Sequence, residues 1–176
     1  LKMYISVICP TYNSSAFISK TIESILDQTY QKFEIIFSDD GSTDETINIL
    51  EKFKIRFQEK KILVRIIKNQ HKGPGFARNE AIKVISYEWI AFIDSDDLWT
   101  KDKLKEAVHE IKKDASVNCV LHRQIFLKQN KKQKYFDFDR YYNFNKPVKN
   151  QLFKTNFFAM STIVIKKKLI IDNGGF

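Results

Sequence analysis

The stretch Trp89–Ile93 is an apolar run that leads directly into three carboxylates, Asp94, Asp96 and Asp97. A short apolar run of this kind is typical of a strand that is buried on both faces, as in a parallel sheet covered by helices. Ligands of open α/β sheets bind at the carboxyl ends of such strands. The sequence therefore predicts a central strand whose end carries an acidic cluster at the edge of a sheet.

The acidic cluster constrains the chemistry at this strand end. Three carboxylates within four positions raise each other's pKa values unless a cation lies among them. Mg²⁺ and Mn²⁺ suit carboxylate ligands, and Mg²⁺ is usually held by one or two of them, with water and substrate phosphate completing its shell. We therefore interpret Asp94–Asp97 as a metal-diphosphate site. The alternative is an acidic turn in which Asp96 or Asp97 caps a helix that begins near Lys101.

Strand-like and helix-like segments alternate along the first two thirds of the chain. Apolar strand-like runs occupy residues 4–10, 33–38, 62–68, 89–93 and 117–127. Amphipathic helical patterns lie between them at residues 16–26, 46–57, 76–85 and 102–113. This order predicts an α/β fold with a Rossmann-like, mostly parallel sheet and helices on both faces. After residue 128 the pattern breaks until a strand-like run at 159–165 and a short helical pattern at 169–173.

Three of the first four predicted strands end in polar residues, at 10–13, 39–42 and 94–97. In a parallel sheet these ends share one edge, so the three groups can converge on one ligand. The ring of Tyr12 can stack on a base, and Asp40 can accept from a base N–H or a ribose hydroxyl. Lys72 and Arg78 are candidates to neutralise phosphate charge. The alternatives are a surface aromatic residue, a plain turn and helix-surface cations.

The charge of the chain is concentrated in its C-terminal third. The net charge is +9, and between Val120 and Ile171 12 lysines and arginines oppose two aspartates, which gives that segment +10. Such a basic patch suits anionic lipid, a phosphorylated substrate or nucleic acid, and the alternative is a solvated lysine-rich face. Of these partners we expect an anionic membrane, in peripheral contact with residues 123–168. No apolar run approaches the roughly 20 residues of a membrane span. We therefore expect a cytoplasmic protein, peripheral at the inner face of the membrane, and no nucleic-acid partner.

Four segments, Val7–Asn13, Ser38–Asp44, Gly75–Asn79 and Phe92–Asp97, together resemble the motifs of the inverting family-two glycosyltransferases, which have the GT-A fold. The resemblance covers nearly the whole chain. It implies an enzyme that transfers a hexosyl or N-acetylhexosaminyl group from a nucleotide sugar, usually a UDP-sugar, to a glycan or lipid-linked acceptor. It also implies inversion, dependence on Mn²⁺ or Mg²⁺, and a role in building bacterial cell-surface polysaccharides.

The resemblance assigns roles to eight residues by position. It implies nucleotide binding by Pro10, Thr11, Tyr12, Asp39, Asp40, Arg78 and Asp96, and metal ligation by Asp97. Within this set, Pro10, Thr11 and Tyr12 are expected to line the base pocket. Asp40 is expected to bind the uracil with Asp39 beside it, while Asp96 contacts the ribose or the sugar.

The end of the chain also carries a resemblance. Gly174–Phe176 is similar to the family's motif that precedes its catalytic Asp or Glu. We therefore expect the catalytic base beyond Phe176 and name none within these residues. The resemblance divides the chain into a nucleotide-sugar-binding core, 1–128, and the start of an acceptor-side region of the same domain, 129–176, which we expect to be truncated. The alternative function is a non-catalytic module that binds a nucleotide sugar.

Overall fold

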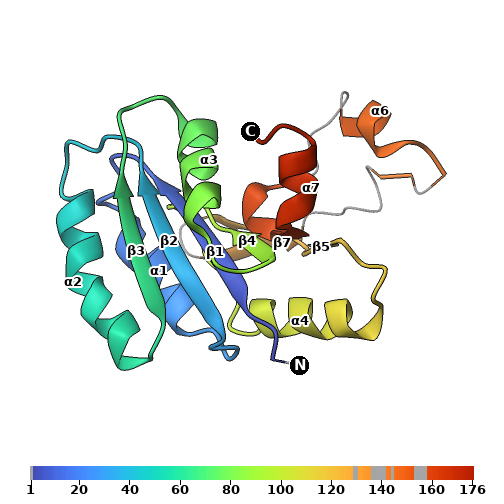
Figure 1. The fold of residues 1–176 in the computed structure, drawn as a ribbon, viewed down its shortest axis with the longest axis horizontal. Helices are drawn as coiled ribbons and strands as arrows, with labels where there is room; N and C mark the ends of the chain where they lie inside the picture. Colours follow the sequence, from blue (N-terminus) through green and yellow to red (C-terminus); the bar gives the residue numbers. More distant parts are fainter. Residues whose placement is uncertain (1, 129–130, 136–141, 144, 153–157) are drawn as a thin grey trace.

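The computed structural model describes residues 2–128, 131–135, 142–143, 145–152 and 158–176 (Figure 1). Its strands are β1 (Ile5–Thr11), β2 (Phe33–Asp39), β3 (Leu63–Lys68), β4 (Trp89–Phe92), β5 (Cys119–Leu121), β6 (Ile125–Lys128), β7 (Lys131–Tyr135) and β8 (Ile163–Lys166). Its helices are α1 (Ile18–Leu26), α2 (Thr46–Glu59), α3 (Pro74–Val84), α4 (Lys103–Lys113), α6 (Val148–Leu152) and α7 (Lys167–Asp172), with a 3-10 turn, η1 (Met160–Thr162).

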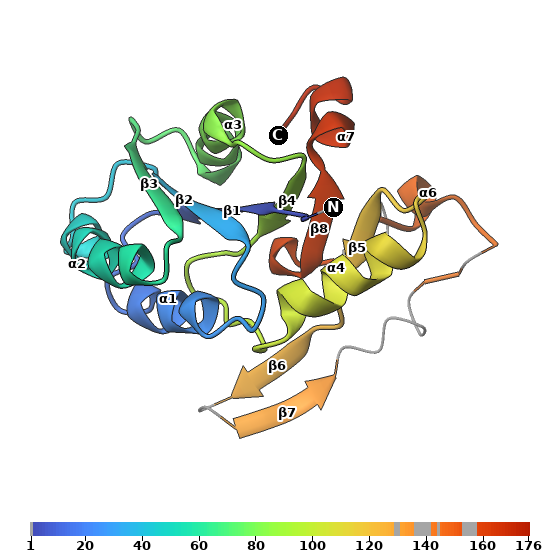
Figure 2. The same ribbon diagram turned by 60° about the horizontal axis from the view of Figure 1, so that its bottom comes forward.

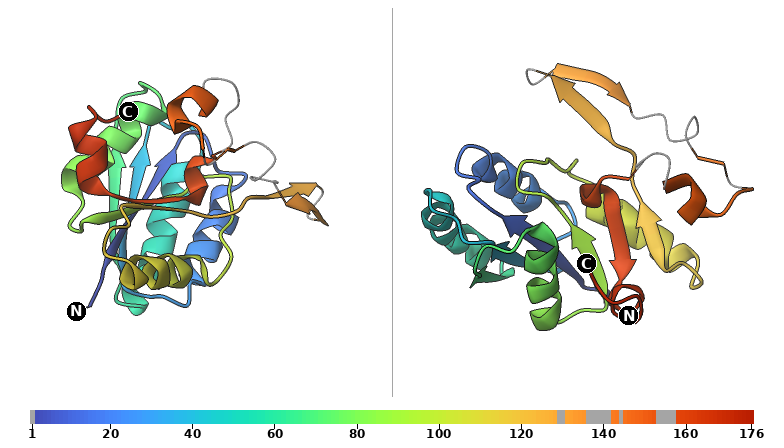
Figure 3. Two further views of the ribbon diagram at one scale, coloured as in Figure 1. Left: turned by 90° about the vertical axis from the view of Figure 1, so that its right-hand side faces the viewer. Right: turned by 90° about the horizontal axis from the view of Figure 1, so that it is seen from above.

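The strands of the described residues form one six-stranded sheet in the order β3-β2-β1-β4-β8-β5 and a separate β6–β7 ribbon, which projects away from the sheet (Figure 3). Strand β1 is parallel to β2 and β4, and β2 is parallel to β3. Strand β8 is antiparallel to both β4 and β5. The prediction of a mostly parallel sheet is confirmed, and β4, which was predicted to be a central strand, lies inside it between β1 and β8.

Helices cover both faces of the sheet, as predicted (Figure 2). On one face, α1, α2 and α4 enclose a core in which Ile22, Leu50 and Leu104 pack against Val7. On the other face, α3 and α7 enclose a smaller core in which Ala81 and Ile170 pack around Ile8 and Ile36. Because successive residues of a strand point to opposite faces, Val7 and Ile8 serve different cores. This explains why the central strands read as continuous apolar runs.

The register of the parallel strands brings their carboxyl ends to one edge. Asp39, the last residue of β2, pairs with Thr11 at the end of β1 and with Lys68 at the end of β3. Beyond the end of β4, the Ile93 N–H donates to the Ile8 carbonyl. The polar segments that follow β1, β2 and β4 therefore start from the same side of the sheet, as the sequence predicted.

The single strand predicted over 117–127 is wrong, since β5 ends at Leu121 and β6 begins at Ile125. The pairing of β5 with β8 ends at the His122 N–H, which donates to the Thr162 carbonyl across 40 positions, a contact that a local pattern does not contain. The strand predicted over 159–165 begins instead with η1, where the Ala159 carbonyl accepts from the N–H and hydroxyl of Thr162. Strand β8 then enters the main sheet between β4 and β5.

Two predictions about the C-terminal third stay predictions. The basic surface expected over 123–168 includes residues 129–130, 136–141, 144 and 153–157, which lie outside the described ranges. The division at residue 128 into a core and an acceptor-side region is likewise a functional prediction. A bilayer crossing requires a long apolar helix, and none of the helices in the described part of the chain meets that requirement.

Candidate functional site

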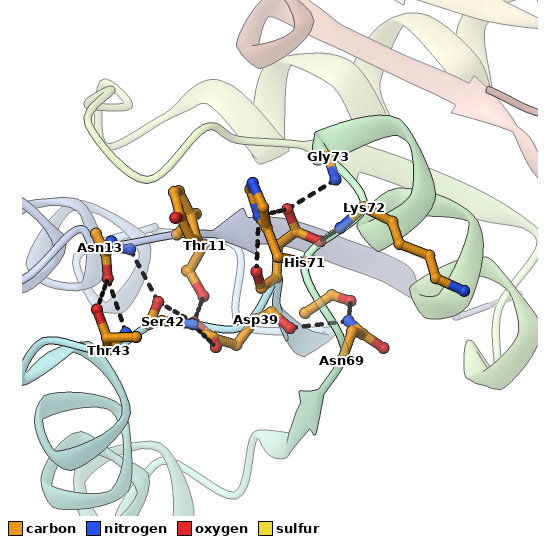
Figure 4. Close-up of polar contacts among 12 residues, drawn as sticks. Thr11, Asn13, Asp39, Ser42, Thr43, Asn69, His71, Lys72 and Gly73 are labelled. Carbon is orange, nitrogen blue, oxygen red and sulfur yellow. Dashed lines mark hydrogen bonds and ion pairs between the residues drawn. The ribbon is translucent and has the colours of Figure 1, made fainter.

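Asp39 joins the ends of β1 and β2. Its side chain is 2% exposed and accepts hydrogen bonds from the Thr11 hydroxyl at 2.8 Å and from both the N–H and the hydroxyl of Ser42 (Figure 4). A buried carboxylate is costly unless such donors satisfy it. The hydrogen bonds of Asp39 therefore hold the turn after β2 against the end of β1.

Asp40 is equally buried, but its partners come from the loop between β3 and α3. Its two carboxylate oxygens accept from the Lys72 and Gly73 N–H groups, each at 2.8 Å (Figure 4). The His71 Nδ1 lies 2.8 Å from the Oδ2 of Asp40. Gly73 has φ +94°, a conformation that side chains rarely adopt, so glycine is required to aim its N–H at Asp40.

The Tyr12 ring lies beside Asp40 in contact with this loop. It is 46% exposed and stacks on the His71 ring, with centroids 4.2 Å apart and planes at 19°. Pro10, two residues before it, is buried inside β1 opposite Ser38. The structure thus brings Tyr12, Asp39 and Asp40 together, and it adds His71, which the sequence reasoning missed.

The segment that follows β1 is held in place by the turn after β2. The Asn13 N–H donates to the Ser42 hydroxyl at 2.9 Å, and the Asn13 side-chain oxygen accepts from the Thr43 N–H at 2.8 Å (Figure 4). The Ser14 N–H donates to the Thr46 hydroxyl at 2.7 Å. These contacts preorganise the loop that presents Tyr12.

The acidic cluster after β4 has a different environment. Asp94 pairs with Arg78 of α3, with 2.6 Å between its Oδ1 and the Nη2 of Arg78. Asp96 is exposed and Asp97 is half-buried. Burial raises the pKa of the Asp97 carboxyl, and the charges of Asp94 and Asp96 raise it further against a hydrogen bond from Ser161. Burial first, and the neighbouring charges second, thus disfavour the ionised Asp97, and a nearby cation would favour it.

Asp96 and Asp97 do not cap the following helix, which contradicts the alternative considered for them. The residue at the start of α4 is Asp102, and it makes no side-chain capping bond. Instead, the Asp97 N–H closes a turn onto the Asp94 carbonyl at 3.1 Å. The turn is fastened to α1 by the Thr21 hydroxyl, which donates to the Ser95 carbonyl at 2.8 Å.

No group of three or more His, Cys, Asp or Glu side chains in metal-binding geometry occurs among the described residues. Mg²⁺ does not need such a cage, because one or two carboxylates with water and substrate phosphate suffice. Arg78 neutralises Asp94, which leaves Asp96 and Asp97 as the carboxylates most open to a cation. Carboxylate oxygens of this kind suit a hard cation such as Mg²⁺ or Mn²⁺.

The chain end packs beside Arg78. The Asn79 side chain donates to the Phe176 carbonyl at 2.8 Å and accepts from the Phe176 N–H at 3.0 Å. The Phe176 ring meets Phe92 edge-on at 5.5 Å and lies 5.6 Å from the guanidinium carbon of Arg78. Gly175 has φ +83°, and a Cβ there would lie 2.7 Å from the Asn79 side-chain oxygen, so this close approach requires glycine.

The buried residue Ser161 is hydrogen-bonded to the segment that carries the acidic cluster. The Asp94 N–H donates to the Ser161 hydroxyl at 2.9 Å, and the Trp99 indole N–H donates to the Ser161 carbonyl at 3.0 Å. Behind them, the Lys103 Nζ lies 3.0 Å from the His122 Nδ1. Burial lowers the pKa of Lys103 to about 7, and burial together with the charge of Lys103 lowers the pKa of His122 to about 4.

The residues that the sequence reasoning missed lie on segments distant in the chain. Ser161 and Asn79 act through hydrogen bonds that bridge 67 and 97 positions. His71 carried one usable signal: it follows β3, and the end of β3 adjoins the end of β2 in a parallel sheet. Lys72, expected near phosphate, places its Nζ 4.9 Å from the Phe76 ring centroid.

Comparison with known proteins supports a single family. The sequence profile described as "Glycosyl transferase family 2" matches residues 6–173. The Escherichia coli protein WfaP, a UDP-Glc:alpha-D-GlcNAc-diphosphoundecaprenol beta-1,3-glucosyltransferase, is 42% identical over 106 residues, which are 60% of this chain and 40% of WfaP.

Two solved structures are similar in fold. The crystal structure of TarS 1–349 from Staphylococcus aureus in complex with UDP has a TM-score of 0.75 and 28% identity, and the match covers 97% of this chain and 49% of that one. TarS, a poly(ribitol-phosphate) beta-N-acetylglucosaminyltransferase, has also been solved with UDP-GlcNAc. The mannosyltransferase PcManGT from Pyrobaculum calidifontis, in complex with GDP-Man and Mn²⁺, has a TM-score of 0.73 and 23% identity over 100% of this chain and 48% of its own.

The chain spans 40% of the length of WfaP and 49% of the TarS chain. The match over residues 6–173 nevertheless includes all of the six-stranded sheet except Ile5, and all the strand-end residues described above. This chain therefore belongs to glycosyltransferase family 2 and has the GT-A fold.

Proposed function

We propose that this chain binds the donor in an inverting, metal-dependent glycosyltransferase that transfers a hexosyl or N-acetylhexosaminyl group from a UDP-sugar. The observation that carries the proposal is that the polar segments after β1, β2 and β4 start from one edge of the sheet, where Thr11 pairs with Asp39 and the Ile93 N–H donates to the Ile8 carbonyl. The names of WfaP and the UDP complexes of TarS support a UDP-sugar donor.

Each part of the edge has a proposed role. Tyr12 offers a ring face to the base and Asp40 an acceptor to the base N–H. Pro10, Thr11 and Asp39 frame that pocket, because Asp39 and Thr11 are hydrogen-bonded to each other and Pro10 is buried in β1 beside them. We assign Arg78 to the nucleotide and Asp96 to the ribose or the sugar, and the ion pair of Arg78 with Asp94 supports this edge of the site.

Asp97, aided by Asp96, is the proposed ligand of Mn²⁺ or Mg²⁺. When bound, the metal would neutralise charge that develops on the departing diphosphate. Inversion requires a carboxylate that takes the proton of the attacking acceptor hydroxyl on the opposite face of the sugar. Asp94, Asp96 and Asp97 belong to the diphosphate side in this scheme, so we assign that base to none of them.

The acceptor and the setting are proposals at the level of chemical class. We propose a glycan or lipid-linked acceptor, approached through residues 129–176, and action at the inner face of a bacterial membrane during surface polysaccharide synthesis. The relatives' names support this class, since WfaP acts on a diphosphoundecaprenol-linked sugar and TarS on poly(ribitol phosphate).

Calorimetry of the purified chain against UDP, UDP-glucose, UDP-GlcNAc and GDP-mannose, each with Mn²⁺ or with EDTA, tests the proposal. We expect binding of the uridine compounds, a strong loss in EDTA, and weaker binding of GDP-mannose because Asp40 would read the base. Equal binding of all four compounds would contradict the base pocket, and equal binding in EDTA would contradict the metal site.

A further inference from the structure

His71 lies where the proposed function puts the base. Its ring stacks on Tyr12 with centroids 4.2 Å apart, and its Nδ1 lies 2.8 Å from Oδ2 and 3.1 Å from the backbone carbonyl oxygen of Asp40. Both neighbours of this nitrogen are acceptors, so Nδ1 carries the hydrogen. His71 therefore makes the two contacts that a uracil base would make: a ring on Tyr12 and an N–H donated to Asp40.

The space between the two rings does not admit a base. Stacked carbon atoms are closest to optimal at about 3.5–4.0 Å, so a third ring inserted between two others needs them roughly 7 Å apart. The Tyr12 and His71 centroids are 4.2 Å apart. A base that stacks on this face of Tyr12 and reaches Asp40 must first displace the imidazole.

The remaining contacts allow the imidazole to leave while the pocket stays formed. The His71 side chain is 58% exposed. Its backbone packs closely against Gly41, where an added Cβ would lie 3.1 Å from the His71 nitrogen. The Lys72 and Gly73 N–H groups hold both oxygens of Asp40 independently of the imidazole. A side-chain rotation of His71 thus opens the pocket without leaving a buried charge unsatisfied.

We propose that His71 is an internal ligand of the base pocket, which a uracil base displaces, and that this competition sets the affinity for the donor. The inference rests on the proposed function and deepens it. A protein whose binding-competent state is populated only in part loses affinity by that fraction. Removing the imidazole should restore the lost affinity, so we expect tighter UDP binding when a smaller side chain replaces His71.

Titration calorimetry of UDP with Mn²⁺ tests this with His71→Ala, His71→Phe and, as a matched control, His109→Ala. His109 is on α4, and its side chain is 74% exposed. We expect His71→Ala to bind UDP roughly three- to tenfold more tightly than the wild type, if the ring occupies the pocket most of the time. His71→Phe, which keeps the stack but cannot donate to Asp40, should fall between the two. Pyrophosphate affinity should not change in any variant.

A second measurement does not depend on the variants. In the free protein the His71 ring protons should carry the ring-current shift of Tyr12 in NMR spectra, and saturating UDP should remove it. A shift that UDP leaves unchanged would overturn the proposal. Weaker UDP binding by His71→Ala would show that His71 contacts the bound nucleotide instead of competing with it. Unchanged binding would show that the imidazole does not compete with the base. If no variant and no wild-type sample bound UDP at all, the proposed function itself would fail, and the inference with it.

Discussion

Two aspartate-rich strand ends lie at the same edge of the sheet, yet their carboxylates have opposite environments. After β2, Asp39 and Asp40 are each 2% exposed, and N–H and hydroxyl donors surround them. After β4, Asp96 is exposed, and the pKa of Asp97 is raised by burial and by its acidic neighbours. The comparison teaches that the donors around a carboxylate decide its use: Asp39 and Asp40 are held by the framework and have no need of a cation, while Asp96 and Asp97 still have capacity for one.

The largest effect expected from this comparison concerns Asp39. Asp39→Ala should lower the free energy of unfolding by about 3 kcal/mol, because three donors at the junction of β1 and β2 would lose their buried acceptor. Urea denaturation measures the change. Asp172→Ala, an exposed aspartate of α7, is the matched control and should be neutral. A loss of similar size in both variants would show that Asp39 has no special structural role.

The metal site should respond in binding rather than in folding. Asp97→Ala should weaken UDP binding in Mn²⁺ by roughly thirtyfold, because about 2 kcal/mol of the binding free energy would depend on the metal. The affinity of the variant in Mn²⁺ should then equal the affinity measured in EDTA. Calorimetry with and without EDTA measures both values, again with Asp172→Ala as control. If Asp97→Ala retained a full response to Mn²⁺, the ligand would be another residue.

The predictability of the two strand ends from sequence differed for a physical reason. The sheet and its acidic ends were predictable, because an apolar run followed by polar residues is a local pattern. The use of each carboxylate was not, because it depends on donors from distant segments. Asp40 meets Lys72 and Gly73 across more than 30 positions, and Ser161 reaches Asp94 across 67. For the same reason the sequence did not show that Asp39 also joins the ends of β1 and β2 through its hydrogen bonds, and its place beside the nucleotide stays a prediction.

A change at Asp40 should affect the affinity for UDP but not the affinity for pyrophosphate, which lacks a base. Asp40→Ala should weaken UDP binding by roughly tenfold, the value of about one hydrogen bond to a charged group, and leave pyrophosphate affinity nearly unchanged. Because Asp40 also holds the loop at Lys72 and Gly73, thermal denaturation should confirm that the variant is folded at the assay temperature. An equal loss for both ligands would move Asp40 from the base pocket to the phosphate site.

The smallest expected effect, on the stability of the folded protein at two pH values, tests most directly whether the environments of Asp97 and Asp39 differ. The raised pKa of Asp97 means that the folded protein binds more protons than the unfolded chain between the ordinary carboxyl value near 4 and the raised value. The stability that this group contributes therefore falls as pH rises through that window, and the ionised Asp97 carboxyl still destabilises the folded protein at neutral pH.

Asp97→Asn should remove this destabilisation, so in EDTA the variant should be slightly more stable than the wild type at pH 7 and no different near pH 4. Asp39→Asn should do the reverse at pH 7, because the Ser42 N–H and hydroxyl donate to different oxygens of Asp39 and the amide nitrogen that replaces one of these oxygens cannot accept. Urea denaturation of both variants at the two pH values decides the matter. If Asp97→Asn were the less stable protein at pH 7, hydrogen bonds such as that from Ser161 would outweigh the repulsion, and the two strand ends would be alike.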